Sequence, residues 1–120
     1  MLPPVVPGCA PPLHLQNWLK SLTMTPTMVL HFLVQGRVQG VGFRWFVHRE
    51  ASELRLSGWV RNTEEGDVEV VASGTPADLA ELRLSLHRGP RGARVDRVIE
   101  HHLDEKEAAG LEHFRIEGAW

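Results

Sequence analysis

Cysteine is nearly absent from this sequence, in which Cys9 is the single example. One cysteine cannot form an internal disulfide or a cysteine-rich metal site. The chain also lacks any stretch of about eighteen apolar residues, the length that a membrane-spanning helix needs. We therefore expect a cytoplasmic protein in a reducing environment, without a membrane partner.

Long runs of one charge are missing as well. Thirteen Lys and Arg oppose fifteen Asp and Glu, and the formal net charge is −2. A broad basic surface for nucleic acid is not predicted, so any anion-binding site must be small. The segment 67–73, which has a strand pattern, contains none of the aromatic residues on which RNA-binding sheets stack bases. We expect no nucleic-acid partner.

Acidic residues are absent from the first 26 positions, which contain six of the eight prolines. We expect residues 1–27 to form a proline-rich, loosely ordered extension, and residues 28–120 to form one domain. Polar residues interrupt the apolar run 13–22, so a secretory signal is not predicted. The sequence leaves open whether Met24 or Met28 is the true start.

Hydrophobic periodicity predicts an alternation of strands and helices after Met28. The pattern predicts strands over 29–34, about 56–63, 67–73 and 95–103, a short last strand over 114–116, and helices over about 43–55 and 76–88. Thr75 and Pro76 are typical of a helix start. This order predicts an α+β fold of the ferredoxin-like, split βαβ type, βαββαβ, in which two helices cover one face of an antiparallel sheet. The strand 95–103 carries interspersed polar residues and should lie at an edge.

A glycine-rich segment, residues 36–44, joins the first strand to the first helix. Glycines allow successive backbone N–H groups to point into one concavity, and a helix start adds further donors. Such a loop can bind a small anion, with Arg44 reaching back to a phosphate. The spacing is also compatible with a tight turn followed by a solvated arginine, since glycine-rich turns between a strand and a helix are common. It matches neither a Walker loop nor a dinucleotide fingerprint.

Two motifs in order resemble the acylphosphatase family. The first is Gly-Arg-Val-Gln-Gly-Val-Gly-Phe-Arg at 36–44, and the second is Gly-Trp-Val-Arg-Asn-Thr at 58–63, followed by a glycine at 66. The resemblance extends to Val-Asp at 95–96 and Phe-Arg-Ile at 114–116, and so covers about 28–117. The sequence departs from the family pattern in the first 27 residues and in the tail 117–120. The tail leaves open whether the C-terminal carboxylate contacts the site.

The resemblance implies a set of site residues. Arg44 would grip the phosphoryl group and Asn62 would hold the attacking water. The phosphate would bind to backbone N–H groups of a loop made of Arg37, Val38, Gln39, Gly40, Val41, Gly42 and Phe43. No metal ion and no other cofactor is implied, and the adjacent His101 and His102 do not suggest a metal site, because neighbouring strand residues point to opposite faces.

The function that the resemblance implies is hydrolysis of the carboxyl-phosphate bond of small acyl phosphates. The products would be a carboxylate and inorganic phosphate, and inorganic phosphate would also inhibit. The alternative is a module that binds phosphate or carbamoyl phosphate without turnover. We expect a monomer. The phosphate-binding loop does not indicate which acyl phosphate is the physiological substrate.

Overall fold

The computed structural model describes residues 27–108 and 111–118. The predicted extension, except for its last residue, lies outside the described residues, and so does Met24, one of the two candidate start residues. The regular elements are β1 (Met28–Arg37), α2 (Phe43–Glu53), β2 (Ser57–Asn62), β3 (Val68–Gly74), α3 (Pro76–Arg88), β4 (Arg94–Leu103), the 3₁₀ helix η1 (Glu105–Ala108) and β5 (Phe114–Ile116).

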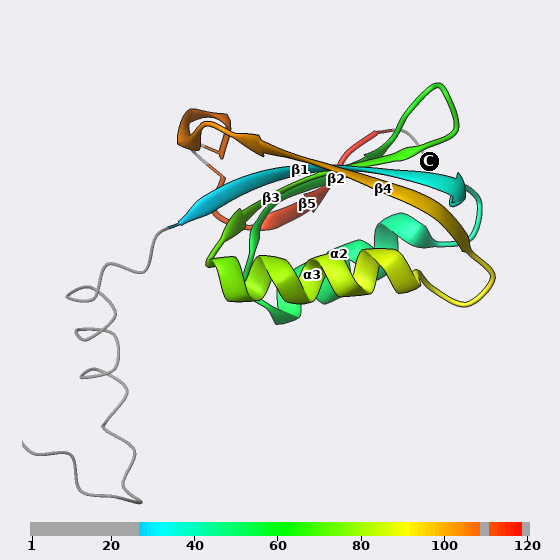
Figure 1. Cartoon of the computed structure of the whole chain (residues 1–120), viewed down its shortest axis with the longest axis horizontal. Coiled ribbons are helices and arrows are strands. Elements are labelled where there is room, and N and C mark those ends of the chain that lie inside the picture. The colour runs from blue at the N-terminus through cyan, green and yellow to red at the C-terminus, as the bar shows by residue number, and fades with distance from the viewer. Residues whose placement is uncertain (1–26, 109–110, 119–120) are drawn as a thin grey trace, which may run out of the picture.

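The five strands form one sheet in the order β4-β1-β3-β2-β5, and both α-helices cover the same face of it (Figure 1). The pairs β1–β3, β1–β4 and β2–β3 are antiparallel. This arrangement confirms the predicted ferredoxin-like fold, including the edge position of β4. No helix among residues 27–108 and 111–118 is long and apolar enough to cross a membrane.

The hydrophobic core lies between the sheet and the two helices. Alternate residues of the central strands, such as Phe32 in β1 and Val70 in β3, are fully buried against helical residues such as Leu82. The start of α3 matches its predicted cap, because the Thr75 hydroxyl accepts a hydrogen bond from the Asp78 N–H (3.2 Å) and Pro76 occupies the first turn. Capping of this kind satisfies a donor that the helix itself cannot pair.

Three features differ from the sequence-based expectation. β1 continues to Arg37, beyond the predicted 29–34, because its last residues pair with the start of β4 across an irregularity at Gln35 and Gly36. η1 was not predicted, since its residues are charged and carry no apolar periodicity. β5 pairs in parallel with β2, so the antiparallel sheet has one parallel edge.

Candidate active site

The loop between β1 and α2 is held at both ends by buried side chains. Val38 is 1% exposed and Phe43 is 2% exposed. Between them, Gly40 and Gly42 both have φ 76°, in the left-handed region that L side chains rarely adopt. A Cβ at either position would meet no atom within 4 Å, so the backbone conformation, and not crowding, favours glycine here. The loop is therefore a backbone turn whose two glycines are exposed to solvent between the buried side chains of Val38 and Phe43.

The N-terminus of α2 adjoins this loop. Gly42 is the N-cap residue, and no side chain caps the helix start. The first turn of a helix has N–H groups without intrahelical acceptors, and the helix dipole places a partial positive charge there. An anion bound on the loop would therefore also be close to the positive end of α2.

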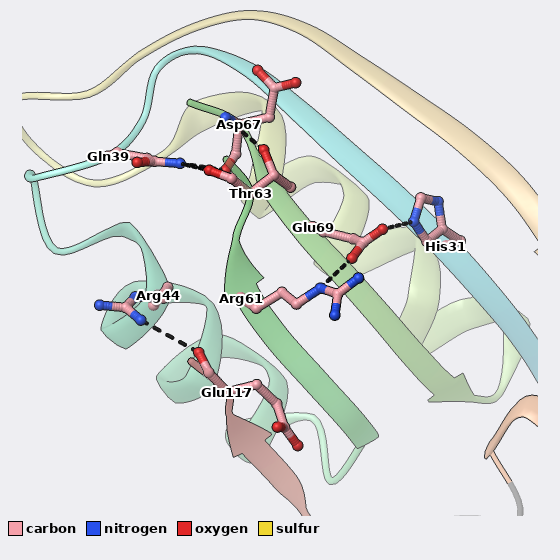
Figure 2. A network of polar contacts seen from close by, with 8 residues as sticks. All are labelled: His31, Gln39, Arg44, Arg61, Thr63, Asp67, Glu69 and Glu117. Atoms are coloured by element: carbon pink, nitrogen blue, oxygen red, sulfur yellow. Dashed lines mark hydrogen bonds and ion pairs between the residues drawn. The ribbon is translucent and has the colours of Figure 1, made fainter. Parts of the chain in front are cut away.

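Arg44 lies in the first turn of α2 and is tied to the end of β5. Its Nη1 donates a hydrogen bond to the main-chain oxygen of Glu117 (3.3 Å), as Figure 2 shows. The Glu117 N–H in turn donates to the Val60 oxygen (2.8 Å), which continues the β2–β5 pairing. The open question about the tail is thus answered in part: the main chain of Glu117 contacts Arg44, whereas the terminal carboxylate lies outside the described residues.

Arg44 and Asn62, the two proposed catalytic residues, line the same cavity of about 190 Å³. Arg44 comes from α2 and Asn62 from the last position of β2, eighteen positions later. The remaining wall is formed by Val38, Gly40, Gly42, Phe43 and Trp45. The structure therefore places most of the predicted loop around the same space as Arg44 and Asn62.

Three residues of the predicted loop do not line this cavity: Arg37, Gln39 and Val41. Arg37 is exposed at the end of β1. Gln39 turns toward the β2–β3 connection, where its Nε2 donates to the main-chain oxygens of Thr63 and Asp67, both at 2.8 Å (Figure 2). Gln39 thus fastens the loop to the segment that follows Asn62. Sequence reasoning missed this role, because no local pattern reports a side-chain bond across 24 residues.

We expect Gln39→Ala to lower the melting temperature by about 4–8 °C, since losing a net hydrogen-bond contribution of about 1 kcal/mol shifts a domain of this size by that much. Inhibition by inorganic phosphate should weaken as well, because the loop loses its tie to β2. Gln35→Ala is the matched control. This variant removes the hydrogen bond that the Gln35 carboxamide donates to the Asp67 carboxylate (3.3 Å) and leaves the contacts of Gln39 in place. Phosphate inhibition should therefore stay at the wild-type level. Equal phosphate inhibition in both variants would contradict the positioning role of Gln39.

A second polar cluster braces the strand that carries Asn62. Glu69 of β3 accepts hydrogen bonds from His31 of β1 (2.9 Å) and from Arg61 of β2 (Figure 2). Burial raises the pKa of Glu69, but the hydrogen bonds from His31 and Arg61 outweigh it and hold that pKa below its usual value. Successive strand residues point to opposite faces, so Arg61 is directed away from the side of Asn62. The cluster joins three strands without lining the cavity.

Within the described ranges, no group of three or more His, Cys, Asp or Glu side chains is placed to hold a metal ion. His101 of β4 lies beside His31 of β1, with ring centroids 6.3 Å apart. The neighbouring His102 pairs in register with Leu30 instead. The two adjacent histidines therefore do not share one site.

Comparison with known proteins agrees with this fold. The family model of acylphosphatases matches residues 30–116. An acylphosphatase from Koribacter versatilis is 53% identical over 103 residues, which are 84% of this chain and 91% of that protein. The crystal structure of acylphosphatase from Bacillus subtilis has a TM-score of 0.72 and 33% identity, covering 76% of this chain and 99% of that one. HypF from T. kodakarensis has a TM-score of 0.67 and 32% identity, but the match covers 77% of this chain and only 12% of that one. The chain belongs to the acylphosphatase family.

Proposed function

We propose that this acylphosphatase hydrolyses small acyl phosphates by direct attack of water on phosphorus, with Arg44 and Asn62 as its catalytic residues. The observation that carries the proposal is the shared cavity, in which a glycine loop, an arginine and a carboxamide face one small space. The backbone N–H groups of loop 37–43 would bind the phosphoryl oxygens, and Arg44 would neutralise the charge that they bear. Asn62 would orient the water.

These groups supply what the reaction needs. Phosphoryl transfer passes through a loose transition state with charge spread over the phosphoryl oxygens, so positioning and charge stabilisation matter more than covalent help. Preorganised N–H donors and a guanidinium provide that stabilisation. Asn62 is neutral, and an aspartate at the same place would repel the substrate phosphate.

The leaving group needs no general acid. A carboxylic acid has a pKa of about 4, so its conjugate base departs without a proton at neutral pH. The water oxygen forms a bond to phosphorus while the bond between phosphorus and the carboxyl oxygen breaks. The carboxyl oxygen keeps the electron pair, and the protons of water pass to the phosphate product and to solvent. No Ser-His-Asp triad and no pair of carboxylates is required.

Further proposals concern the domain, its oligomeric state and its location in the cell. We propose that residues 28–120 form the catalytic domain, acting as a monomer in the cytoplasm without a nucleic-acid partner. A module that binds phosphate or carbamoyl phosphate without turnover is the alternative. The presence of both Arg44 and Asn62 at one cavity favours the enzyme, because a binding module has no need for a group that positions water.

The purified chain should release inorganic phosphate from benzoyl phosphate, and the rate should persist in excess chelator, because loop 37–43 and Arg44 supply the charge that a metal ion would otherwise provide. Inorganic phosphate and sulfate should inhibit competitively by occupying the loop. The measurement is phosphate release with and without EDTA, at several phosphate concentrations. A rate that chelator abolishes and Mg²⁺ or Zn²⁺ restores would contradict metal independence. Competitive binding without turnover would support the module.

A further inference from the structure

A second cavity, of about 370 Å³, adjoins the cavity that Arg44 and Asn62 line, here called the phosphate cavity. The two share Gly42 and Trp45 as walls, and the second is completed by Phe46, His48, Arg49 and Pro90. The mechanism derived above leaves this space without a role. Its continuity with the phosphate cavity makes it a candidate site for the part of the substrate that is not phosphate.

The inner wall of this second cavity is built on one face of α2. Trp45, His48 and Arg49 are spaced three and four residues apart, so they lie side by side on the helix. The Trp45 and His48 rings meet edge to face with centroids 6.2 Å apart, and His48 meets Phe114 in the same way at 6.4 Å. Trp45 is nevertheless 57% exposed. The helix thus presents a large indole surface to solvent at the edge of the proposed phosphate site.

The charges around the cavity are partly compensated. Arg49 donates to Glu50 (3.4 Å) and lies 5.8 Å from the centre of the Phe46 ring. Arg88 also approaches Glu50, at 3.8 Å. One carboxylate stands against two guanidiniums, and Arg49 is the one arginine in the cavity wall, beside aromatic rings and Pro90. A flat, apolar group suits the aromatic part of this wall.

The second cavity does not include the residue proposed to hold the water. In an in-line displacement the leaving group departs from the side opposite the attacking water. Asn62, the proposed water ligand, lines the first cavity and not the second, whereas Gly42 and Trp45 line both. An acyl group that extends past the shared Gly42 and Trp45 wall would therefore leave Asn62 and its water in the first cavity.

We propose that this second cavity is an acyl-group subsite, and that it selects acyl phosphates with a planar aromatic acyl group through stacking on Trp45. The proposal rests on the proposed function, in which the loop binds the phosphoryl end of the substrate. Burial of an exposed indole against a substrate ring removes apolar surface from water and adds an aromatic pair. An acetyl group is too small to make this contact.

The test compares kcat/KM for benzoyl phosphate and acetyl phosphate. Trp45→Ala should lower the benzoyl-to-acetyl ratio by about tenfold, as expected for a lost aromatic pair and its buried area. Trp45→Phe keeps a flat apolar face and should retain most of the ratio. Leu84→Ala, which truncates the other large exposed apolar side chain, 65% exposed on α3, is the matched control and should leave the ratio unchanged. Thermal denaturation checks that each variant is folded.

The outcomes separate the two proposals. If the wild type hydrolyses both substrates but Trp45→Ala lowers both rates equally, the subsite proposal is wrong and the proposed function stands. Release of phosphate from neither substrate would overturn both proposals. A third substrate, benzoyl phosphate with a 4-carboxylate, tests the apolar character of the site. If that substrate is preferred and Arg49→Gln abolishes the preference, the cavity selects charge, and aromatic selection is overturned.

Discussion

Arg44→Gln is expected to lower kcat/KM for acyl phosphate hydrolysis by about 10²–10³-fold, the usual effect of removing a preorganised electrostatic donor. Glutamine keeps a polar side chain of moderate length but loses the charge and the planar fork that matches two phosphate oxygens. Competitive inhibition by inorganic phosphate should weaken in parallel, because Arg44 would contact phosphate in the ground state as well as in the transition state. Steady-state kinetics at several phosphate concentrations measure both effects.

Two controls accompany this variant. Arg44→Lys restores the charge without the fork and should recover only part of the lost rate. Arg91→Gln removes a charge from an exposed position in the turn between α3 and β4 and should leave the kinetics near the wild-type level. Because Arg44 also donates to the Glu117 oxygen, melting temperatures are needed to separate catalysis from stability. A rate for Arg44→Gln within tenfold of the wild type, in a folded protein, would remove Arg44 from the mechanism.

Asn62→Ala is expected to lower kcat by a similar order, about 10²–10³-fold, while inhibition by inorganic phosphate stays close to the wild type. The carboxamide would position the water and leave phosphate binding to the loop and Arg44. Its loss therefore removes an interaction needed for turnover and not for anion binding. Turnover and phosphate inhibition, measured on the same preparation, separate the two roles.

Asn62→Asp provides the contrasting variant. It keeps the size of the side chain but places a negative charge at the phosphate cavity, so phosphate inhibition should weaken in addition to the loss of turnover. The water-positioning role would be wrong if Asn62→Ala kept more than about a tenth of the wild-type rate, given the expected size of the effect. It would also be wrong if that variant weakened phosphate binding as strongly as Arg44→Gln.

Local patterns in the sequence were sufficient for most of the fold. The bounds of α3 follow from the Thr75 cap and the glycine after Arg88, and both signals act within a few residues of the backbone that they shape. The change of period at Phe43 likewise marks the start of α2. The pairing of β5 with β2 was not predicted, because no local signal in the sequence reports it. The parallel pairing of β5 depends on which strand edge remains open once the four longer strands have assembled.

By itself, the sequence determined the order of elements, the family resemblance and the identity of the residues proposed to act, Arg44 and Asn62. The tertiary structure decided how those residues meet. It placed the end of β2 beside the start of α2, bound Gln39 to Thr63 and Asp67, and brought the Glu117 oxygen to Arg44. It also placed Trp45 between two cavities. Periodicity and caps record forces between residues near one another in the chain, whereas these contacts join residues far apart in sequence and exist only after the sheet and helices have packed.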